Sequence, residues 1–188
     1  MEKYLILDIE TCPIDLPEYE KLDEEERKKL LNPIDCKIIA IGMRSQGENN
    51  IFLDEDEKTM LISFWEKFSE LRQSGTLIIG FNLLPFDIPF LITRSFINNV
   101  PIVPFTIKYV VDLREKITAY RHQPSRGTLK DFAAAMGLEN LGDGSQVPFL
   151  CKDKAWEKLK QYLQHDLVIT DTMYQRLKEL HILDIQRY

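Results

Sequence analysis

The stretch that decides the fold is YLILDIETCP, residues 4–13. Its first half is aromatic and aliphatic, which is typical of a buried strand. Asp8 and Glu10 then follow two positions apart, and because side chains alternate along a strand, both share the face of Tyr4 and Ile6. Two partly desolvated carboxylates repel each other unless a cation lies between them, and Mg²⁺ suits such a pair. The alternative is an ordinary strand end that has reached solvent.

The composition is that of a soluble globular protein. The chain has 188 residues, of which 44% are hydrophobic and 29% charged, and we expect a single domain over residues 1–188. It contains no apolar run long enough for a membrane helix, and its N-terminus lacks the pattern of a signal peptide. Cys12, Cys36 and Cys151 are scattered, so the sequence indicates neither a disulfide framework nor a zinc site. We therefore expect a cytoplasmic protein without a membrane partner.

The charge distribution leaves a nucleic-acid partner open. The formal net charge of −6 argues mildly against one, because phosphate binding is driven by Lys and Arg. Residues 108–130 nevertheless form a locally basic segment, which carries Lys108, Arg114, Lys116, Arg121, Arg126 and Lys130 against Asp112 and Glu115. This segment is either a solvated surface or a surface that faces a substrate.

The order of the elements predicts an α/β fold. We expect strands over residues 3–10, 36–45, 51–54, 76–82 and 107–113, and helices over residues 16–33, 57–75, 86–99, 127–138 and 154–183. GENN, residues 47–50, is a turn signal that predicts a hairpin. Three antiparallel strands followed by alternating strand and helix indicate a mixed sheet with helices on both faces.

A second polar group follows the apolar strand in IIGFNLLPFDIPFL, residues 78–91. Asn82 and Asp87 stand where a parallel strand leads into a helix, and ligand sites of open α/β sheets gather at the carboxyl ends of strands. The alternative role for Asp87 is to cap the helix that Pro89 opens. The two roles are compatible.

A third group lies in QYLQHDLVIT, residues 161–170. Tyr162 and Asp166 are four positions apart, so they share one face of a helix. Asp166 flanks the apolar stripe, and an ionised carboxylate at the edge of a core requires a partner. The alternative is a boundary tyrosine beside a solvated acid.

Together, DIE, N-x-x-x-F-D and Y-x-x-x-D resemble, in this order, the DEDD exonuclease superfamily in its tyrosine (DEDDy) branch. The likeness is greatest to the 3′–5′ exonuclease domain of family B DNA polymerases and its stand-alone forms. GTLKDFAAAMGL, residues 127–138, and DGSQVP, residues 143–148, are also similar to segments of that group. The resemblance implies an RNase H-like fold, with a five-stranded mixed sheet whose first three strands are antiparallel.

The resemblance also implies roles for individual residues. Two Mg²⁺ or Mn²⁺ ions would be held by Asp8, Glu10, Asp87 and Asp166, and would supply charge neutralisation and a nucleophile for phosphodiester hydrolysis. Tyr162 would orient the attacking water, while Thr11, Asn82 and Phe86 would contact the substrate. Gln161 occupies the position that the histidine branch requires, so that branch is excluded. We expect His165 to point away from the site and Asp112 to be structural.

The implied activity is a 3′–5′ exonuclease on single-stranded ends, with DNA as the first choice of substrate. The alternatives are an RNase D-like exoribonuclease, an RNase H-like endonuclease and a catalytically inactive binding module. An inactive module usually lacks a carboxylate, whereas all four are present here. A polymerase or repair complex acting in trans is a candidate partner.

Overall fold

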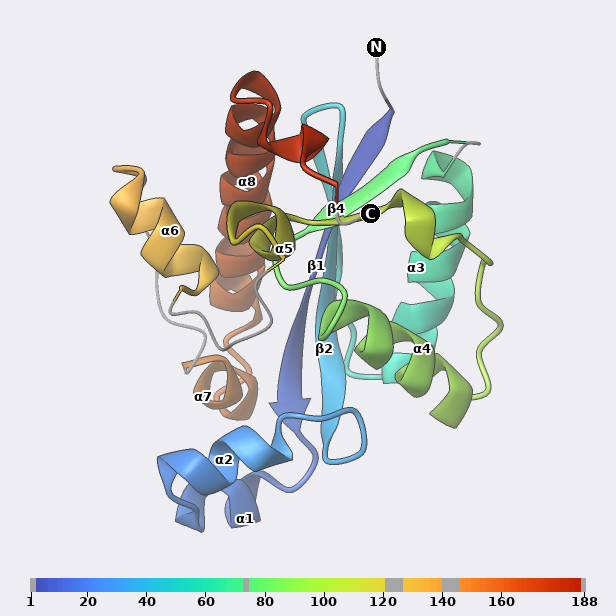
Figure 1. The fold of residues 1–188 in the computed structure, drawn as a ribbon. Coiled ribbons are helices and arrows are strands. Elements are labelled where there is room, and N and C mark those ends of the chain that lie inside the picture. Colours follow the sequence, from blue (N-terminus) through green and yellow to red (C-terminus); the bar gives the residue numbers. More distant parts are fainter. Residues whose placement is uncertain (1–2, 73–74, 121–126, 140–145, 187–188) are drawn as a thin grey trace.

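A five-stranded mixed sheet lies between two layers of helices in the computed structural model, which describes residues 3–72, 75–120, 127–139 and 146–186 (Figure 1). Its strand order is β3-β2-β1-β4-β5. Strand β1 pairs antiparallel with β2, as β2 does with β3, while β1–β4 and β4–β5 are parallel. The predicted mixed sheet with three antiparallel strands is confirmed. The strands are β1 (Tyr4–Pro13), β2 (Cys36–Ser45), β3 (Glu48–Phe52), β4 (Leu77–Gly80) and β5 (Val110–Asp112).

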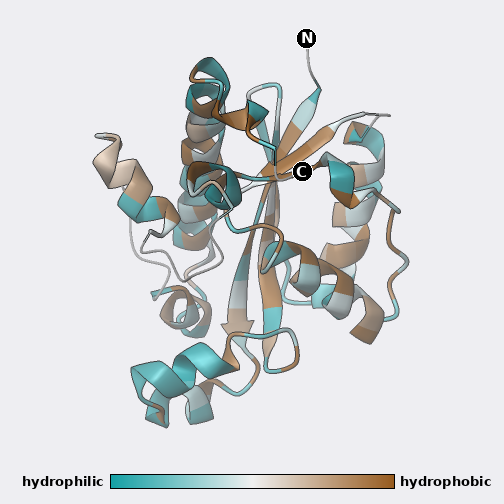
Figure 2. Ribbon diagram, viewed as in Figure 1, coloured by the Kyte–Doolittle hydropathy of each residue, from teal (hydrophilic) through white to brown (hydrophobic). Residues whose placement is uncertain are grey.

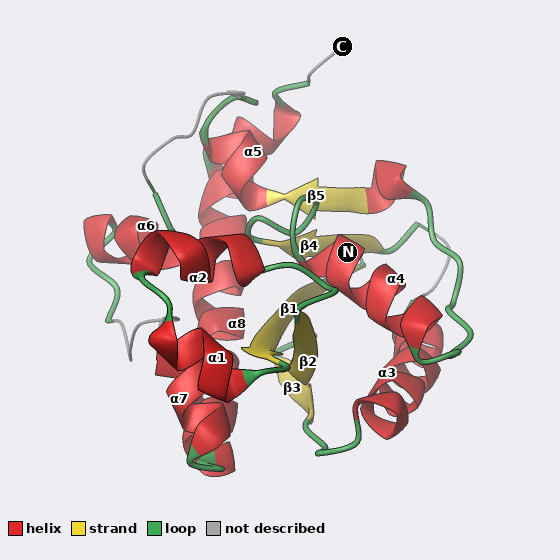
Figure 3. Cartoon of the chain, turned by 90° about the horizontal axis from the view of Figure 1, so that it is seen from below, coloured by secondary structure: helices red, strands yellow, loops and turns green. Residues whose placement is uncertain are grey.

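Helices cover both faces of this sheet (Figures 1 and 3). One face carries α3 (Glu57–Leu71) and α4 (Asp87–Ile97). The other face carries α5 (Leu113–Ile117), α6 (Leu129–Ala135), α7 (Val147–Lys152) and α8 (Trp156–Glu179). Helices α1 (Leu16–Lys21) and α2 (Glu24–Leu30) lie beyond the end of β1. Among the described residues, no helix is long and apolar enough to span a membrane.

Several predicted boundaries were wrong, each because of a local backbone feature. The hairpin turn is formed by Gln46 and Gly47, whose φ angles of 53° and 86° suit a two-residue turn, so β3 begins at Glu48. Residues 16–33, expected to form a helix or a helical excursion on the surface, form two short helices, because Asp23 caps α2 with a capping box.

Two further boundaries, those of β5 and α7, also differ from the prediction. The expected strand over residues 107–113 is shorter, since residues 107–109 form a 3₁₀ turn and the Asp112 side chain caps α5. Helix α7 begins at Val147, within the DGSQVP stretch where no helix was expected, because Pro148 is compatible with a first helical turn.

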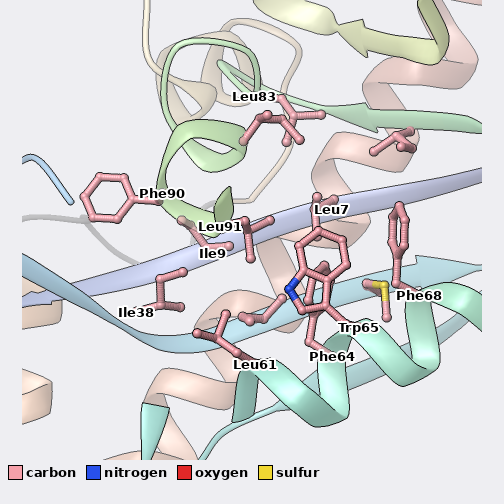
Figure 4. Packing of buried hydrophobic residues seen from close by; sticks show 14 of the residues in the cluster. Leu7, Ile9, Ile38, Leu61, Phe64, Trp65, Phe68, Leu83, Phe90 and Leu91 are labelled. Carbon is pink, nitrogen blue, oxygen red and sulfur yellow. The ribbon is translucent and has the colours of Figure 1, made fainter. Parts of the chain in front are cut away.

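The core is divided by the sheet into two apolar layers. Toward α3 and α4, β1 directs Leu5, Leu7 and Ile9 into a cluster with the aromatic face of α3 (Figure 4). Toward α8, β1 directs Ile6, which packs with residues such as Leu167. The hydropathy colouring agrees: β4 is hydrophobic, whereas α2 is almost entirely hydrophilic (Figure 2).

A glycine in β2 allows α8 to lie directly on the sheet. Gly42 pairs with Asp8 across the β1–β2 ladder. A Cβ atom at this position would lie 2.8 Å from Leu167 Cδ1 and 3.0 Å from Leu163 Cγ. The absence of a side chain therefore brings α8 close to β1 at the level of Asp8.

A buried ion pair fixes α4 to its neighbours on the opposite face. Arg94 Nη2 donates to Glu57 Oε2 at 2.6 Å, and the backbone N–H of Ile38 donates to Glu57 Oε1 at 2.7 Å. Asn98 donates to the same carboxylate. Because each charge is paired and hydrogen-bonded, the network holds α3, α4 and β2 in one arrangement.

We expect Gly80→Ala to lower the free energy of unfolding by roughly 2–3 kcal/mol, because the new Cβ would overpack the β1–β4 pair. It would lie 2.7 Å from the Leu7 carbonyl oxygen. Gly47→Ala is the control, since that site has open space and only an unfavourable φ of 86°, which costs about 1 kcal/mol. Urea unfolding compares the two variants, and equal losses would contradict the close β1–β4 packing.

Candidate active site

Three carboxylates from two elements converge at the end of β1. Asp8 and Glu10 project from β1 and Asp166 from α8, and one oxygen of each lies within 4.8 Å of the others. The strand period places the first two on the side of the sheet that α8 covers. The close approach of α8 at Gly42 then brings in the third.

A fourth carboxylate supports this group from the other side of β1. Asp87 is only 2% exposed, and its Oδ1 accepts a hydrogen bond of 3.0 Å from the backbone N–H of Ile9, the residue between Asp8 and Glu10. Phe86 occupies the N-cap position of α4 without a side-chain hydrogen bond. Asp87 therefore begins the helix while its side chain is directed at β1.

The four carboxylates are electrostatically coupled. Burial raises the pKa of Asp8 well above its usual value, and the Asp166 charge raises it further. Burial also raises the pKa of Glu10, and the charges of Asp8 and Asp166 raise it further. Burial raises the pKa of Asp87 as well, with a further contribution from the charge of Asp8. Burial also raises the pKa of Asp166. Such a group gains stability from a positive partner.

The donor set fits a hard divalent cation. Among the described residues, Asp166 Oδ1 is the one buried side-chain oxygen or nitrogen without a hydrogen-bond partner. It belongs to the same three-carboxylate group as Asp8 and Glu10. Carboxylate oxygens are the ligands that Mg²⁺ prefers, and a bound ion would satisfy the unpartnered atom.

A lysine and a tyrosine complete the site. Lys130 of α6 donates a hydrogen bond to the hydroxyl of Tyr162, and its ammonium nitrogen lies 4.1 Å from the centre of the tyrosine ring. The lysine charge lowers the pKa of Asp8, Glu10 and Asp166, opposing their burial. A hydrogen bond from Tyr162 also lowers the pKa of Asp166.

Sequence reasoning singled out Lys130 only as one member of a basic segment. A lysine early in a helix, after the capping residue Thr128, is a common pattern without functional meaning. Lys130 lies beside Tyr162 because α6 packs against α8. Of the same basic segment, Arg121 and Arg126 lie outside the described residues, as do residues 143–145 of the DGSQVP stretch.

Two cavities meet at β1. The smaller, of about 270 Å³, is lined by the acidic group together with Lys130 and Tyr162. The larger, of about 690 Å³, shares Ile9 and Glu10 with it. Its other walls come from the end of β1, the α1–α2 pair, α7 and the start of α4, and include Thr11, Tyr19, Arg27, Phe86 and Phe149. An acidic centre thus adjoins a roomier cavity that has aromatic walls.

The remaining predicted residues lie outside both cavities. Asn82, with a left-handed φ of 61°, accepts a hydrogen bond of 2.9 Å from Arg114. Asp112 accepts from the backbone N–H groups of Asn82 and Leu84, each at 3.0 Å, so it shapes the connection from β4 to α4. His165 Nε2 lies 2.9 Å from the carbonyl oxygen of Glu139.

Comparisons with known proteins agree with this architecture. The sequence profile of the RNase H superfamily matches residues 30–178. The match includes Asp87, Tyr162 and Asp166, and begins after β1. Uncharacterized protein MJ0365 of Methanocaldococcus jannaschii is 31% identical over 167 residues, which is 82% of this chain and 93% of that protein.

A solved structure shares the fold. The family B DNA polymerase from the hyperthermophilic archaeon Pyrobaculum calidifontis is similar with a TM-score of 0.67 and 19% identity. The likeness covers 97% of this chain and 25% of the polymerase chain. This chain therefore spans about a quarter of that protein.

We expect Asp166→Asn to raise the thermal midpoint of the metal-free protein at neutral pH, because it removes one of the mutually repelling charges. The acidic pKa values are raised in the folded state, so the stability these groups contribute is present at low pH and lost as pH rises through the raised values. The gain from Asp166→Asn should accordingly grow with pH. Thermal unfolding in EDTA across a pH series measures it.

The same variant should lose the response to metal. Mg²⁺ or Mn²⁺ should raise the midpoint of the wild type but not that of Asp166→Asn. Glu66→Gln, on the exposed face of α3, is the control and should respond like the wild type. A metal response that survives in Asp166→Asn would contradict the cation site.

Proposed function

The chain belongs to the RNase H superfamily, and from this premise we propose that it is a metal-dependent 3′–5′ exonuclease of the DEDDy branch that acts on single-stranded nucleic acid. The observation that carries the proposal is the convergence of Asp8, Glu10, Asp87 and Asp166, from three separate elements, beside the hydroxyl of Tyr162. Superfamily membership indicates a nuclease acting on nucleic acid; the 3′–5′ direction and the single-stranded substrate are the proposed refinement.

The carboxylates would hold two Mg²⁺ or Mn²⁺ ions. Such ions supply charge neutralisation and a nucleophile for phosphodiester hydrolysis. Asp8, Glu10 and Asp166 each have a carboxylate oxygen within 4.8 Å of the others. Asp87 is held next to them by the hydrogen bond that its carboxylate accepts from the backbone N–H of Ile9. Their positive charge would also let a phosphate approach a chain whose formal net charge is −6.

Tyr162 and Lys130 would organise the reacting groups. The tyrosine oxygen accepts from the Lys130 ammonium, so its own proton is directed to an acceptor such as Asp166. A hydroxyl polarised in this way would orient a water molecule for attack on phosphorus. Lys130 also lines the acidic cavity, where its charge would stabilise the negative charge that develops on the phosphate.

The larger cavity would receive the nucleoside at the 3′ end of the strand. It adjoins the acidic centre through Glu10, and Phe86 and Phe149 offer aromatic surfaces against which a base could stack. Thr11 lines the same cavity. Stacking accepts every base, so we propose little sequence preference, with DNA as the first choice and RNA as the alternative. The enzyme would act alone or in trans with a polymerase or repair complex.

The nuclease test is stepwise shortening of a 5′-labelled single strand with Mn²⁺ or Mg²⁺, run on DNA and RNA in parallel. EDTA should abolish the activity, and Asp8→Ala should lower it by about a hundredfold or more through lost metal binding. Glu66→Gln should match the wild type. If metal-loaded wild type leaves both DNA and RNA intact, the proposed activity is wrong.

We further expect Lys130→Ala to lower kcat by about a hundredfold or more, because one preorganised cation at the reacting phosphate is lost. Lys130→Arg should recover part of the rate. Lys160→Ala, on an exposed position of α8, is the matched control and should leave kcat unchanged. Single-turnover kinetics separates the chemical step from binding, and an unchanged rate in Lys130→Ala would exclude the lysine from the mechanism.

A further inference from the structure

The three cysteines, scattered in the sequence, lie together near the end of β1. Cys36 of β2 pairs opposite Pro13, and Cys12 pairs opposite Lys37. Cys151 belongs to α7, which packs against β1, and it contacts the cluster that contains Cys12. The Cys12 and Cys151 thiols are hydrogen-bonded to each other, and all three cysteines are free thiols.

The environments of these thiols differ in a way that selects one pair. Cys12 is 0% exposed, whereas Cys151 is half-buried and reachable from solvent. The hydrogen bond from Cys12 lowers the pKa of Cys151, and the nearby Lys37 charge lowers it too, against the effect of burial. Since the thiolate is the nucleophile, Cys151 is the thiol that reacts first.

Cys36 is held apart from this chemistry. Its Sγ donates to the carbonyl oxygen of Leu30 at 3.2 Å, and burial raises its pKa to about 11. It is fully buried, with 1% exposure. Cys36 therefore provides an internal comparison, because it is a free thiol in the same region that lacks the solvent access of Cys151 and has no thiol hydrogen-bond partner of the kind that Cys12 and Cys151 share.

We propose that Cys12 and Cys151 form a reversible disulfide when the protein meets a two-electron oxidant such as hydrogen peroxide. The Cys151 thiolate attacks one peroxide oxygen and the O–O bond breaks, which gives a sulfenic acid and hydroxide. The Cys12 sulfur then displaces the hydroxyl group from the Cys151 sulfur, and its proton leaves with that group as water. Overall, two thiols lose two electrons and two protons, and one peroxide becomes two waters.

The bond would join two walls of the larger cavity. Thr11 and Pro13 flank Cys12 and line that cavity, as do Val147 and Phe149 on the helix of Cys151. A disulfide would fix α7 to β1 and so set the spacing between these walls. The inference does not depend on the nuclease proposal, because it uses none of the carboxylates.

The experiment oxidises the full chain with hydrogen peroxide, counts free thiols and maps peptides under non-reducing conditions. The three free thiols should fall to one, with Cys12 and Cys151 in one linked peptide, and dithiothreitol should restore all three. Cys36→Ser should still form the bond, whereas Cys151→Ser should not.

Two outcomes would overturn the proposal: three thiols that persist after oxidation, or a bond that joins Cys36 or two separate chains. Circular dichroism confirms that each variant is folded. The peptide map of the wild type decides the matter even if a variant fails to fold.

Discussion

Repulsion among buried and half-buried carboxylates at the end of β1 is the constraint on which the rest of the structure depends. Four acids with raised pKa values are held near one strand, so the surrounding elements must compensate for charge that the site itself disfavours. Asp87 is tied to the backbone of Ile9, and Lys130 supplies the nearby positive charge. The buried pair of Glu57 and Arg94 fixes the helix that carries Asp87.

The tertiary arrangement would also explain how an acidic chain could act on the anionic substrate of the proposed reaction. The formal net charge of −6 describes the whole surface, whereas a reacting phosphate would meet the local field of the site. In that field, a lysine and bound cations would outweigh the acids. The basic segment recognised in the sequence contributes through Lys130, while Lys116 is occupied by the carbonyl oxygens of Leu183 and Ile185.

The features that depend on local periodicity, such as strand bounds and the face on which a side chain lies, could be predicted from the sequence. The strand over residues 36–45 was located with its bounds, and the two-residue spacing of Asp8 and Glu10 placed them on one face. Tertiary contacts could not be predicted in this way. Lys130 reaches Tyr162 because α6 packs on α8. Asn82 accepts a hydrogen bond from Arg114, 32 positions further along the chain.

The position of β1 in the sheet has a consequence for how the protein unfolds. Hydrogen bonds hold β1 to β2 on one edge from Ile6 onward. On the other edge they hold Tyr4–Ile6 to β4 and the N–H of Ile9 to Asp87, and α8 lies across the strand. Regions paired on all sides open only with the whole fold, whereas frayed ends and loops open locally. Asp8 and Asp166 therefore sit in the last part of the protein to open, and on heating the site should persist until the chain unfolds as a whole.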